Sequence, residues 1–273
     1  MKVLITGANT GIGRVTAETL ARSGAHVVLA GRSKEKTEPV VQAIAAEKKG
    51  SAEFVPVDLA DLDSVRACAK ALLDDGEPID VLIANAGLAG LRGTTKQGFE
   101  TTFGTNHLGH FLLVTELLPL LRKQPSRIVV VSSKAHFDAK GIDWDALRKP
   151  TRTVSGFPEY GVSKLCNVLF VKELARGRAG EGVHSYALHP GVIASDVWRQ
   201  VPWPFRSVMK MFMKTTLEGA QTSLYCATSK DVADHDGRYY DDSKEVPCSE
   251  VGDDPELAKT LWQKSEEWIG SSP

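Results

Sequence analysis

A tyrosine followed four residues later by a lysine, Tyr160 and Lys164, is the pattern in this sequence with the clearest chemistry. On a helix, positions i and i+4 share one face, so the ammonium group would lie close to the phenol. A free tyrosine has a pKa of about 10, and a cation about 4 Å away contributes about 4 kcal/mol at an effective dielectric of 20. This corresponds to about three pKa units. The spacing therefore predicts a phenol that acts as a general acid or base near neutral pH.

The same spacing occurs a second time, at Tyr240 and Lys244, but the neighbouring residues favour the first pair. Tyr160 opens an apolar stretch with the length of a helix and follows a predicted strand that ends in two serines. Tyr240 follows a glycine turn and precedes two acidic residues, which would raise its pKa. We expect Tyr160 to be catalytic and Tyr240 to be a partly exposed structural aromatic near the C-terminal edge of the sheet.

A glycine-rich segment, Thr6–Gly13, joins the first predicted strand to the first predicted helix. Its glycines let the backbone turn tightly and approach a diphosphate at the helix N-terminus. The segment therefore predicts a dinucleotide site. Its glycine spacing of four then two differs from the GxGxxG fingerprint, so a glycine-rich turn without a ligand remains the alternative for this segment alone.

The residues after the second predicted strand bear on the choice between NAD(H) and NADP(H). An acidic residue at this point would accept hydrogen bonds from a free ribose 2′-hydroxyl and repel a 2′-phosphate. The sequence has Gly31 where the acid would stand, followed by Arg32, whose guanidinium suits a phosphate. This favours NADP(H), and the alternative for Arg32 is a solvated arginine at a strand end.

Short runs rich in valine and isoleucine alternate with longer helical patterns along the chain. The runs are apolar on both faces, which is typical of a parallel sheet covered by helices on each side. The chain is therefore predicted to be an α/β protein with a Rossmann-type, doubly wound parallel β-sheet, in a single domain over 1–273. The predicted strands are Val3–Thr6, His26–Ala30, Glu53–Val57, Val81–Ala84, Arg127–Ser132 and His184–His189, and the predicted crossover helices include Gly13–Ser23, Ser64–Leu73, Leu108–Leu121 and Tyr160–Arg176.

Two stretches interrupt this alternation, at about 134–158 and 195–214, and both follow the end of a predicted strand. Ligands of such sheets bind beyond the carboxyl ends of the strands, so both are candidate substrate loops. Residues 201–214 are apolar, rich in methionine and interleaved with cations. This composition suits a lid over an apolar substrate or contact with a membrane interface, and a plain packing helix is the alternative.

Composition excludes several other classes of protein. A net charge of -1 with 25% charged residues argues against a nucleic-acid partner. The four cysteines lack disulfide or zinc-ligand spacing, so we expect no metal site and a reducing, cytoplasmic location. The first predicted strand begins at Lys2 and no apolar run reaches about 18 residues, so we expect neither a signal peptide nor a membrane span.

Taken in order, the motifs resemble those of the short-chain dehydrogenase/reductase family over nearly the whole chain. Each motif alone could occur by chance, but the ordered set is highly specific. The matching elements are Thr6–Gly13, Asp58-Leu59, Asn85-Ala86-Gly87, Asn106, Ser133, Tyr160 to Lys164 and Pro190-Gly191.

The resemblance implies a role for each matching residue. Tyr160 would protonate the carbonyl oxygen during reduction or deprotonate the alcohol during oxidation, and Ser133 would hydrogen-bond the same oxygen. Lys164 would bind the nicotinamide ribose, and Asn106 would hold a water that links Lys164 to solvent. The residues implied in cofactor binding are Gly7, Asn9, Thr10, Gly11, Ile12, Arg32, Asp58, Leu59, Asn85, Ala86, Gly87, Tyr160, Lys164, Pro190, Gly191, Ile193 and Ser195.

Structural interpretations compete with some of these assignments. Ser132 is the nearest competitor of Ser133, because adjacent strand residues point to opposite faces. Asn106 could instead cap a helix. The nearby histidines lack metal-ligand spacing and are expected to be structural; they are His107, His110, His136 and His189.

Within the family, the chain is similar to the retinol dehydrogenase branch in the segments 106–111, 132–136 and 218–227. This implies an NADP(H)-dependent oxidoreductase that interconverts an alcohol and an apolar aldehyde or ketone, such as retinol and retinal. The alternatives are a general reductase of small carbonyl compounds and a catalytically silent NADP(H)-binding regulator. The branch includes monomers, and other relatives form dimers, so both a monomer and a homodimer are compatible with it.

Overall fold

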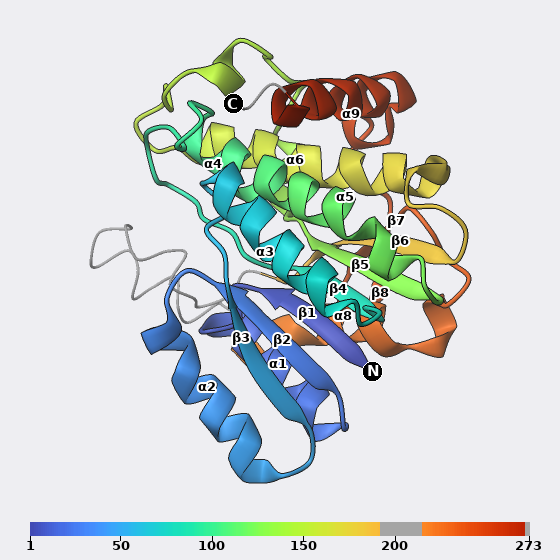
Figure 1. Cartoon of the computed structure of the whole chain (residues 1–273). Coiled ribbons are helices and arrows are strands. Elements are labelled where there is room, and N and C mark those ends of the chain that lie inside the picture. Colours follow the sequence, from blue (N-terminus) through green and yellow to red (C-terminus); the bar gives the residue numbers. More distant parts are fainter. Residues whose placement is uncertain (192–214, 271–273) are drawn as a thin grey trace.

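The computed structural model describes residues 1–191 and 215–270, which form one eight-stranded sheet with helices on both faces (Figure 1). The strand order is β3-β2-β1-β4-β5-β6-β7-β8. Strands β1 to β7 pair in parallel, and only β8 pairs antiparallel, with β7. The strands are β1 (Lys2–Thr6), β2 (His26–Gly31), β3 (Ser51–Pro56), β4 (Val81–Ala84), β5 (Ser126–Val131), β6 (Val183–His189), β7 (Arg238–Asp241) and β8 (Lys244–Glu245).

The helices form a layer on each side of the sheet, so the predicted doubly wound fold is confirmed (Figure 1). One layer contains α1 (Gly11–Arg22), α2 (Lys34–Glu47) and α8 (Thr216–Thr228). The other contains α3 (Leu62–Asp75), α5 (Gly109–Leu121) and α6 (Phe157–Glu173), and α9 (Pro255–Gly270) packs on the outside of α6.

Two hydrophobic cores follow from the alternation of side chains along the buried strands. On β1, Leu4 points into the core beneath α3, α5 and α6, whereas Val3 and Ile5 point into the core beneath α1, α2 and α8. All three side chains are fully buried. This explains why the central strands read as continuous apolar runs, because neither face of the sheet meets water.

The six predicted strands are all present, with ends within two residues of the prediction. The helix predicted to begin at Leu108 begins earlier, because the short helix α4 (Thr101–Phe103) and the π-helical turn η1 (Gly104–Leu108) lead directly into α5. Strands β7 and β8 were not predicted. Tyr240 lies on β7 with only 1% of its surface exposed, so the expectation of a partly exposed side chain is wrong.

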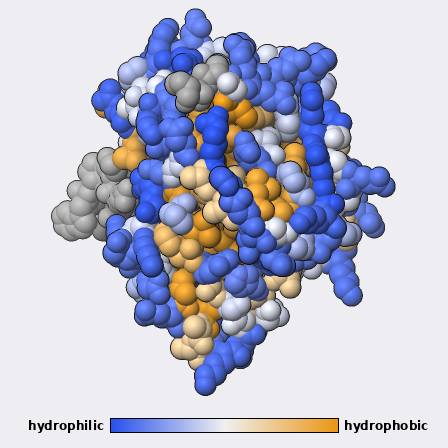
Figure 2. Space-filling view, viewed as in Figure 1, coloured by the Kyte–Doolittle hydropathy of each residue, from blue (hydrophilic) through white to orange (hydrophobic). Residues whose placement is uncertain are grey.

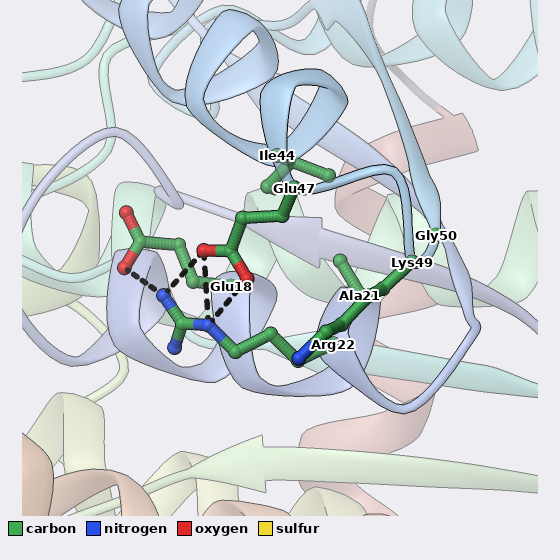
Figure 3. A pocket seen from close by; sticks show the side chains of 7 residues that line it. All are labelled: Glu18, Ala21, Arg22, Ile44, Glu47, Lys49 and Gly50. Carbon is green, nitrogen blue, oxygen red and sulfur yellow. Dashed lines mark hydrogen bonds and ion pairs between the residues drawn. The ribbon is translucent and has the colours of Figure 1, made fainter.

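Helices α1 and α2 are joined by an ion pair at their C-terminal ends, beside a small surface hollow (Figure 3). The guanidinium of Arg22 lies between the carboxylates of Glu47, at 2.8 Å, and Glu18, at 3.7 Å. Gly50 lines the same hollow, and a Cβ atom there would lie 2.3 Å from the carbonyl oxygen of Ala21. These contacts close the turn between α2 and β3.

Charged and polar side chains cover most of the face seen in Figure 2, with apolar side chains showing between them down its middle. Within the described residues, no helix combines the length and the apolar character needed to cross a bilayer. The predicted substrate loop at 134–158 is described and contains the 3-10 turns η2 (Lys134–Phe137) and η3 (Ala146–Arg148). The other predicted loop, 195–214, lies outside the described residues.

Candidate active site

The predicted site residues gather at one edge of the sheet, where the parallel strands β1, β4, β5 and β6 end. Parallel strands present their carboxyl ends on the same side, so segments far apart in sequence meet there. The glycine turn follows β1, Asn85 follows β4, Ser132 follows β5 and Pro190 follows β6. Helices α1 and α6 begin at this edge and complete the site.

The glycine turn has a backbone that only glycine adopts readily. Gly7 has φ +68° and Gly11 has φ +58°. A Cβ atom on Gly13 would lie 2.4 Å from Nδ2 of Asn85 and 2.6 Å from the carbonyl oxygen of Gly7. The first turn of α1 contains no acidic residue, and its N-cap Thr10 makes no capping hydrogen bond through its side chain. The free N–H groups of this helix end suit the diphosphate of a dinucleotide, so these residues fit the predicted cofactor.

Thr6 joins the glycine turn to the segment after β4. Its Oγ1 accepts hydrogen bonds from the backbone N–H groups of Asn85, at 3.0 Å, and Ala86, at 2.9 Å. The Asn85 side chain donates in return to the Thr6 carbonyl at 2.8 Å. Asn85 and Ala86 therefore support the shape of the cofactor turn.

Arg32 lies exposed at the end of β2, and it makes no hydrogen bond or ion pair with another described residue that would occupy its guanidinium. The next residue, Ser33, caps α2 by accepting a hydrogen bond from the N–H of Lys36 at 3.3 Å. The first turn of α2 also has Lys34 exposed. The Arg32 guanidinium is therefore available to an anionic group at this strand end.

Asp58 and Leu59 differ in what they offer a cofactor. Asp58 is partly exposed, and one of its carboxylate oxygens accepts the N–H of Ala60 at 3.0 Å. The Leu59 side chain is buried in the core. A Cβ atom on Gly109 of α5 would lie 2.4 Å from the Leu59 carbonyl oxygen, so this segment packs directly on α5.

Tyr160 and Lys164 lie one turn apart on α6, as predicted. Lys164 is buried and Tyr160 is partly buried, and Nζ of Lys164 lies 5.6 Å from the centre of the Tyr160 ring. The ammonium donates a hydrogen bond to the Val131 carbonyl at 2.9 Å. A Cβ atom on Gly87 would lie 3.3 Å from Nζ, so Gly87 leaves room for the lysine.

Burial governs the protonation of this pair. It raises the pKa of Tyr160, and a hydrogen bond with the Ser133 side chain acts in the opposite direction. Burial also lowers the pKa of Lys164 to about 8. In the protein without cofactor, removal from water therefore shifts the pKa of Tyr160 in the direction opposite to the one predicted from its spacing to Lys164.

The structure separates the roles of the two serines. Ser132 is buried and its Oγ donates to the carbonyl of Lys164 at 2.7 Å, so it fastens β5 to α6. Ser133 points the other way and hydrogen-bonds Tyr160. The arrangement places Ser133, and not Ser132, beside the phenol.

The peptide group after Ser133 is held by two histidines. Its carbonyl accepts the Nδ1–H of His136 at 2.7 Å, and the N–H of Lys134 donates to Nδ1 of His189 at 3.3 Å. The Nε2 of His136 accepts in turn from the N–H of Ser249 at 3.1 Å. Within the described residues, no group of three or more histidine, cysteine, aspartate or glutamate side chains is arranged to hold a metal ion.

Asn106 lies in the π-helical turn and joins three segments of the site. Its Oδ1 accepts the N–H of Leu88 at 2.9 Å, and its Nδ2 donates to the Leu88 carbonyl at 2.9 Å and to Oγ of Ser163 at 3.0 Å. The alternative of Asn106 as a helix cap is wrong, because the buried carboxylate of Glu100 caps this helix by accepting from Thr102 and Phe103. Sequence reasoning missed Glu100 and Ser163, and glutamate is not among the residues usually found at a helix N-cap, so the sequence carried no clear signal for Glu100.

The remaining predicted residues divide into two groups. Pro190 and Gly191 follow β6, and Gly191 has φ +95°. Ile193 and Ser195 lie outside the described residues.

In the loop 134–158, the apolar residues Phe137, Val154 and Phe157 are exposed by 43%, 87% and 39%. Two of them, Phe137 and Phe157, lie close in sequence to Ser133 and Tyr160.

A family model described as short chain dehydrogenase matches residues 1–144. The chain belongs to the short-chain dehydrogenase family. It is similar to retinol dehydrogenase 12 of Mus musculus, with 42% identity over 98% of this chain and 86% of the relative. Retinol dehydrogenase 14 of Homo sapiens is 41% identical over 98% of this chain and 86% of its own. The protein is therefore a short-chain oxidoreductase that acts on CH–OH groups with NAD(H) or NADP(H).

Solved structures agree with this placement. An uncharacterized protein from Mycobacterium paratuberculosis superposes with a TM-score of 0.79 and 34% identity, covering 98% of this chain and 93% of that protein. A short-chain dehydrogenase from Escherichia coli CFT073, solved in complex with NADPH, shares the fold with a TM-score of 0.72 and 24% identity, over 89% of this chain and 96% of that one.

Proposed function

We propose that this protein is an NADPH-dependent reductase of apolar aldehydes or ketones, with retinal as the model substrate. The observation that carries the proposal is the convergence of Ser133 and Tyr160 beside the buried Lys164, at the sheet edge where the glycine turn would receive a dinucleotide. The exposed apolar residues Phe137 and Phe157, close in sequence to Ser133 and Tyr160, and the names of the relatives support an apolar substrate.

A dinucleotide bound at the glycine turn would supply the hydride that the carbonyl carbon accepts. Ser133 donates a hydrogen bond to the carbonyl oxygen, and Tyr160 gives its proton to the same oxygen. Because burial raises the pKa of Tyr160, the phenol holds its proton until the oxygen develops negative charge. Lys164 stabilises the resulting phenolate by its charge. In the reverse direction the same groups remove the proton from the alcohol.

NADPH is preferred to NADH on the basis of Arg32, which is exposed at the end of β2, where no acidic residue stands. A charge-assisted hydrogen bond to phosphate contributes about 1.5–3 kcal/mol, which corresponds to about a ten- to hundred-fold change in affinity. We expect Arg32→Ala to raise the KM for NADPH by this factor and to change the KM for NADH by less than about two-fold. The matched control is Arg238→Ala, which removes an exposed arginine on β7 and should leave both values unchanged.

The test follows oxidation of NADPH and NADH at 340 nm with all-trans-retinal and a panel of smaller aldehydes and ketones. The proposal predicts faster turnover with NADPH and with the apolar aldehyde. Faster turnover with small carbonyl compounds would indicate a general carbonyl reductase. Tight binding of NADPH without oxidation by any carbonyl compound would contradict the proposal and identify a silent binding protein.

A further inference from the structure

A chain of buried hydrogen bonds joins the cofactor turn to the catalytic helix, and a histidine stands at its centre. Thr6 Oγ1 lies 2.8 Å from Nε2 of His110, and Nδ1 of His110 lies 3.0 Å from the carbonyl oxygen of Asn106. Asn106 bonds Ser163, whose Oγ donates to the carbonyl of Tyr160 at 2.8 Å. Thr6, His110, Asn106 and Ser163 are each at most 1% exposed.

The partners of Thr6 determine where the proton on His110 resides. A hydroxyl oxygen accepts two hydrogen bonds and donates one. Thr6 Oγ1 already accepts from the N–H groups of Asn85 and Ala86, so its own proton must point at Nε2 of His110. Nε2 is therefore an acceptor, and the ring carries its proton on Nδ1. This agrees with the other bond, because the carbonyl of Asn106 can only accept.

His110 is held neutral by its surroundings. Burial lowers its pKa to about 4, and the charge of Lys164 acts in the same direction. A doubly protonated ring would also place a donor against the Thr6 hydroxyl, which has no lone pair left to accept. Near neutral pH only the Nδ1–H form satisfies both partners.

We propose that His110, fixed as the Nδ1–H tautomer, is a positioning residue that couples the cofactor-binding turn to the catalytic residues. On one side it holds Thr6, which precedes the glycine turn and supports Asn85 and Ala86. On the other side it holds the π-helical turn that carries Asn106. Oδ1 of Asn106 and Nζ of Lys164 both lie beside Gly87. The inference rests on the proposed reductase function for its kinetic test, but not for its spectroscopic one.

The neighbouring His107 provides a matched control. It lies in the π-helical turn that also carries Asn106, just before α5, is 1% exposed and has a pKa lowered to about 3 by burial. Its Nε2 lies 3.3 Å from Oγ of Ser265 on α9, and its ring packs against Phe103. His107 thus matches His110 in burial but faces away from the cofactor turn.

The first test is the tautomer itself, read in the cofactor-free protein at neutral pH by two-bond ¹H–¹⁵N NMR correlation of the imidazole rings. The His110 signal is assigned by its absence from the His110→Gln spectrum. The proposal predicts a protonated Nδ1 and an unprotonated Nε2. An Nε2–H tautomer, or an imidazolium at pH 7, would overturn it.

The second test uses two substitutions of His110, each of which removes the hydrogen bond of one ring nitrogen and retains a polar group near the other. Asparagine retains a donor near Nδ1, whereas glutamine retains an acceptor near Nε2. We expect His110→Asn to raise the Kd for NADPH about three- to ten-fold, because the bond to Thr6 is lost. We expect His110→Gln to lower kcat by a similar factor with the Kd changed by less than about two-fold, because the bond to Asn106 is lost.

His107→Gln serves as the control, with a lower melting temperature expected but kcat and the Kd for NADPH within about two-fold. If both His110 variants change only the melting temperature, as this control does, the proposal is wrong. NADPH binding is measured by nucleotide fluorescence and the tautomer by NMR, so both can be read even if no carbonyl substrate turns over. A failure of the proposed function is therefore distinguishable from a failure of this inference.

Discussion

The two tyrosine–lysine pairs of this chain have identical spacing, yet the structure gives them unrelated surroundings. Tyr160 and Lys164 lie on one helix, so four residues bring the two side chains together on one face. Tyr240 and Lys244 lie on β7 and β8, joined by a turn in which Asp242 has φ +49° and Ser243 has φ +59°. In the hairpin, Lys244 pairs with Asp241 and not with the tyrosine.

The environments differ as much as the geometry. The Tyr240 hydroxyl hydrogen-bonds Nδ1 of His235 at 2.7 Å, its ring packs on Tyr186, and Lys244 is exposed. Lys164 is buried, so its charge is expensive to maintain and acts strongly on its neighbours. The same sequence spacing therefore gives a reactive tyrosine–lysine pair only where a helix brings the two side chains together and burial excludes water.

Replacing each lysine by methionine should give the largest difference between the two pairs, in both the free energy of unfolding and kcat. Burial lowers the pKa of Lys164 to about 8, from 10.5 in the unfolded chain, so the charged form is disfavoured in the folded protein. This penalty is complete below pH 8 and disappears as the pH rises to 10.5. Lys164→Met should therefore raise the free energy of unfolding by about 1–3 kcal/mol at pH 7, with a smaller gain at pH 10.

The same variant should lower kcat at least about a hundred-fold, because the phenolate loses its stabilising charge. Lys244→Met should change the free energy of unfolding by less than about 0.5 kcal/mol and leave kcat unchanged. Urea unfolding at the two pH values measures stability, and NADPH oxidation measures activity. A loss of stability in Lys164→Met at pH 7 would show that the buried charge is not costly.

The two serines at the end of β5 extend the comparison to adjacent positions. Ser133→Ala removes a donor to the reacting oxygen and should lower kcat about a hundred-fold, with stability nearly unchanged. Ser132→Ala removes the buried bond to the Lys164 carbonyl and should cost about 1 kcal/mol of stability, with kcat within about three-fold. Comparable kinetic losses in both variants would contradict the separation of their roles.

The smallest effect is expected in the hairpin of the second pair. Ser243 adopts a left-handed backbone that glycine adopts without strain. Ser243→Gly should raise the free energy of unfolding by about 0.5 kcal/mol and leave kcat unchanged. Thermal unfolding followed by circular dichroism measures the change. A lower melting temperature would mean that the Ser243 side chain contributes more than its backbone strain costs.

The central sheet and the grouping of the motifs could be predicted from sequence because each rests on a local pattern. Apolar runs identified six strands, and parallel strands bring their carboxyl ends together regardless of loop length. The last two strands of the sheet, β7 and β8, were missed, since they span only Arg238–Asp241 and Lys244–Glu245 and β8 includes no apolar residue. Short strands of this kind are formed by tertiary pairing more than by local preference.

The protonation of the site could not be predicted in this way. The spacing of Tyr160 and Lys164 indicated an attraction between the two groups, but burial, which depends on the whole fold, has the larger effect on both pKa values. The bonds of Thr6, His110 and Asn106 join residues up to 104 positions apart, and no local pattern encodes them. Sequence therefore identifies the participants of the site, whereas the fold determines their charge and tautomer.

The most direct test of the account is the rate of NADPH oxidation by all-trans-retinal in wild-type protein, Tyr160→Phe and Tyr240→Phe, with NADPH binding measured alongside. Loss of a general acid costs about 10²- to 10⁴-fold, so Tyr160→Phe should lose activity by this factor while still binding NADPH. Tyr240→Phe should retain kcat within about three-fold and lose only the stability of its bond to His235. If Tyr160→Phe retains its rate, or both variants lose it equally, Tyr160 is not the proton donor.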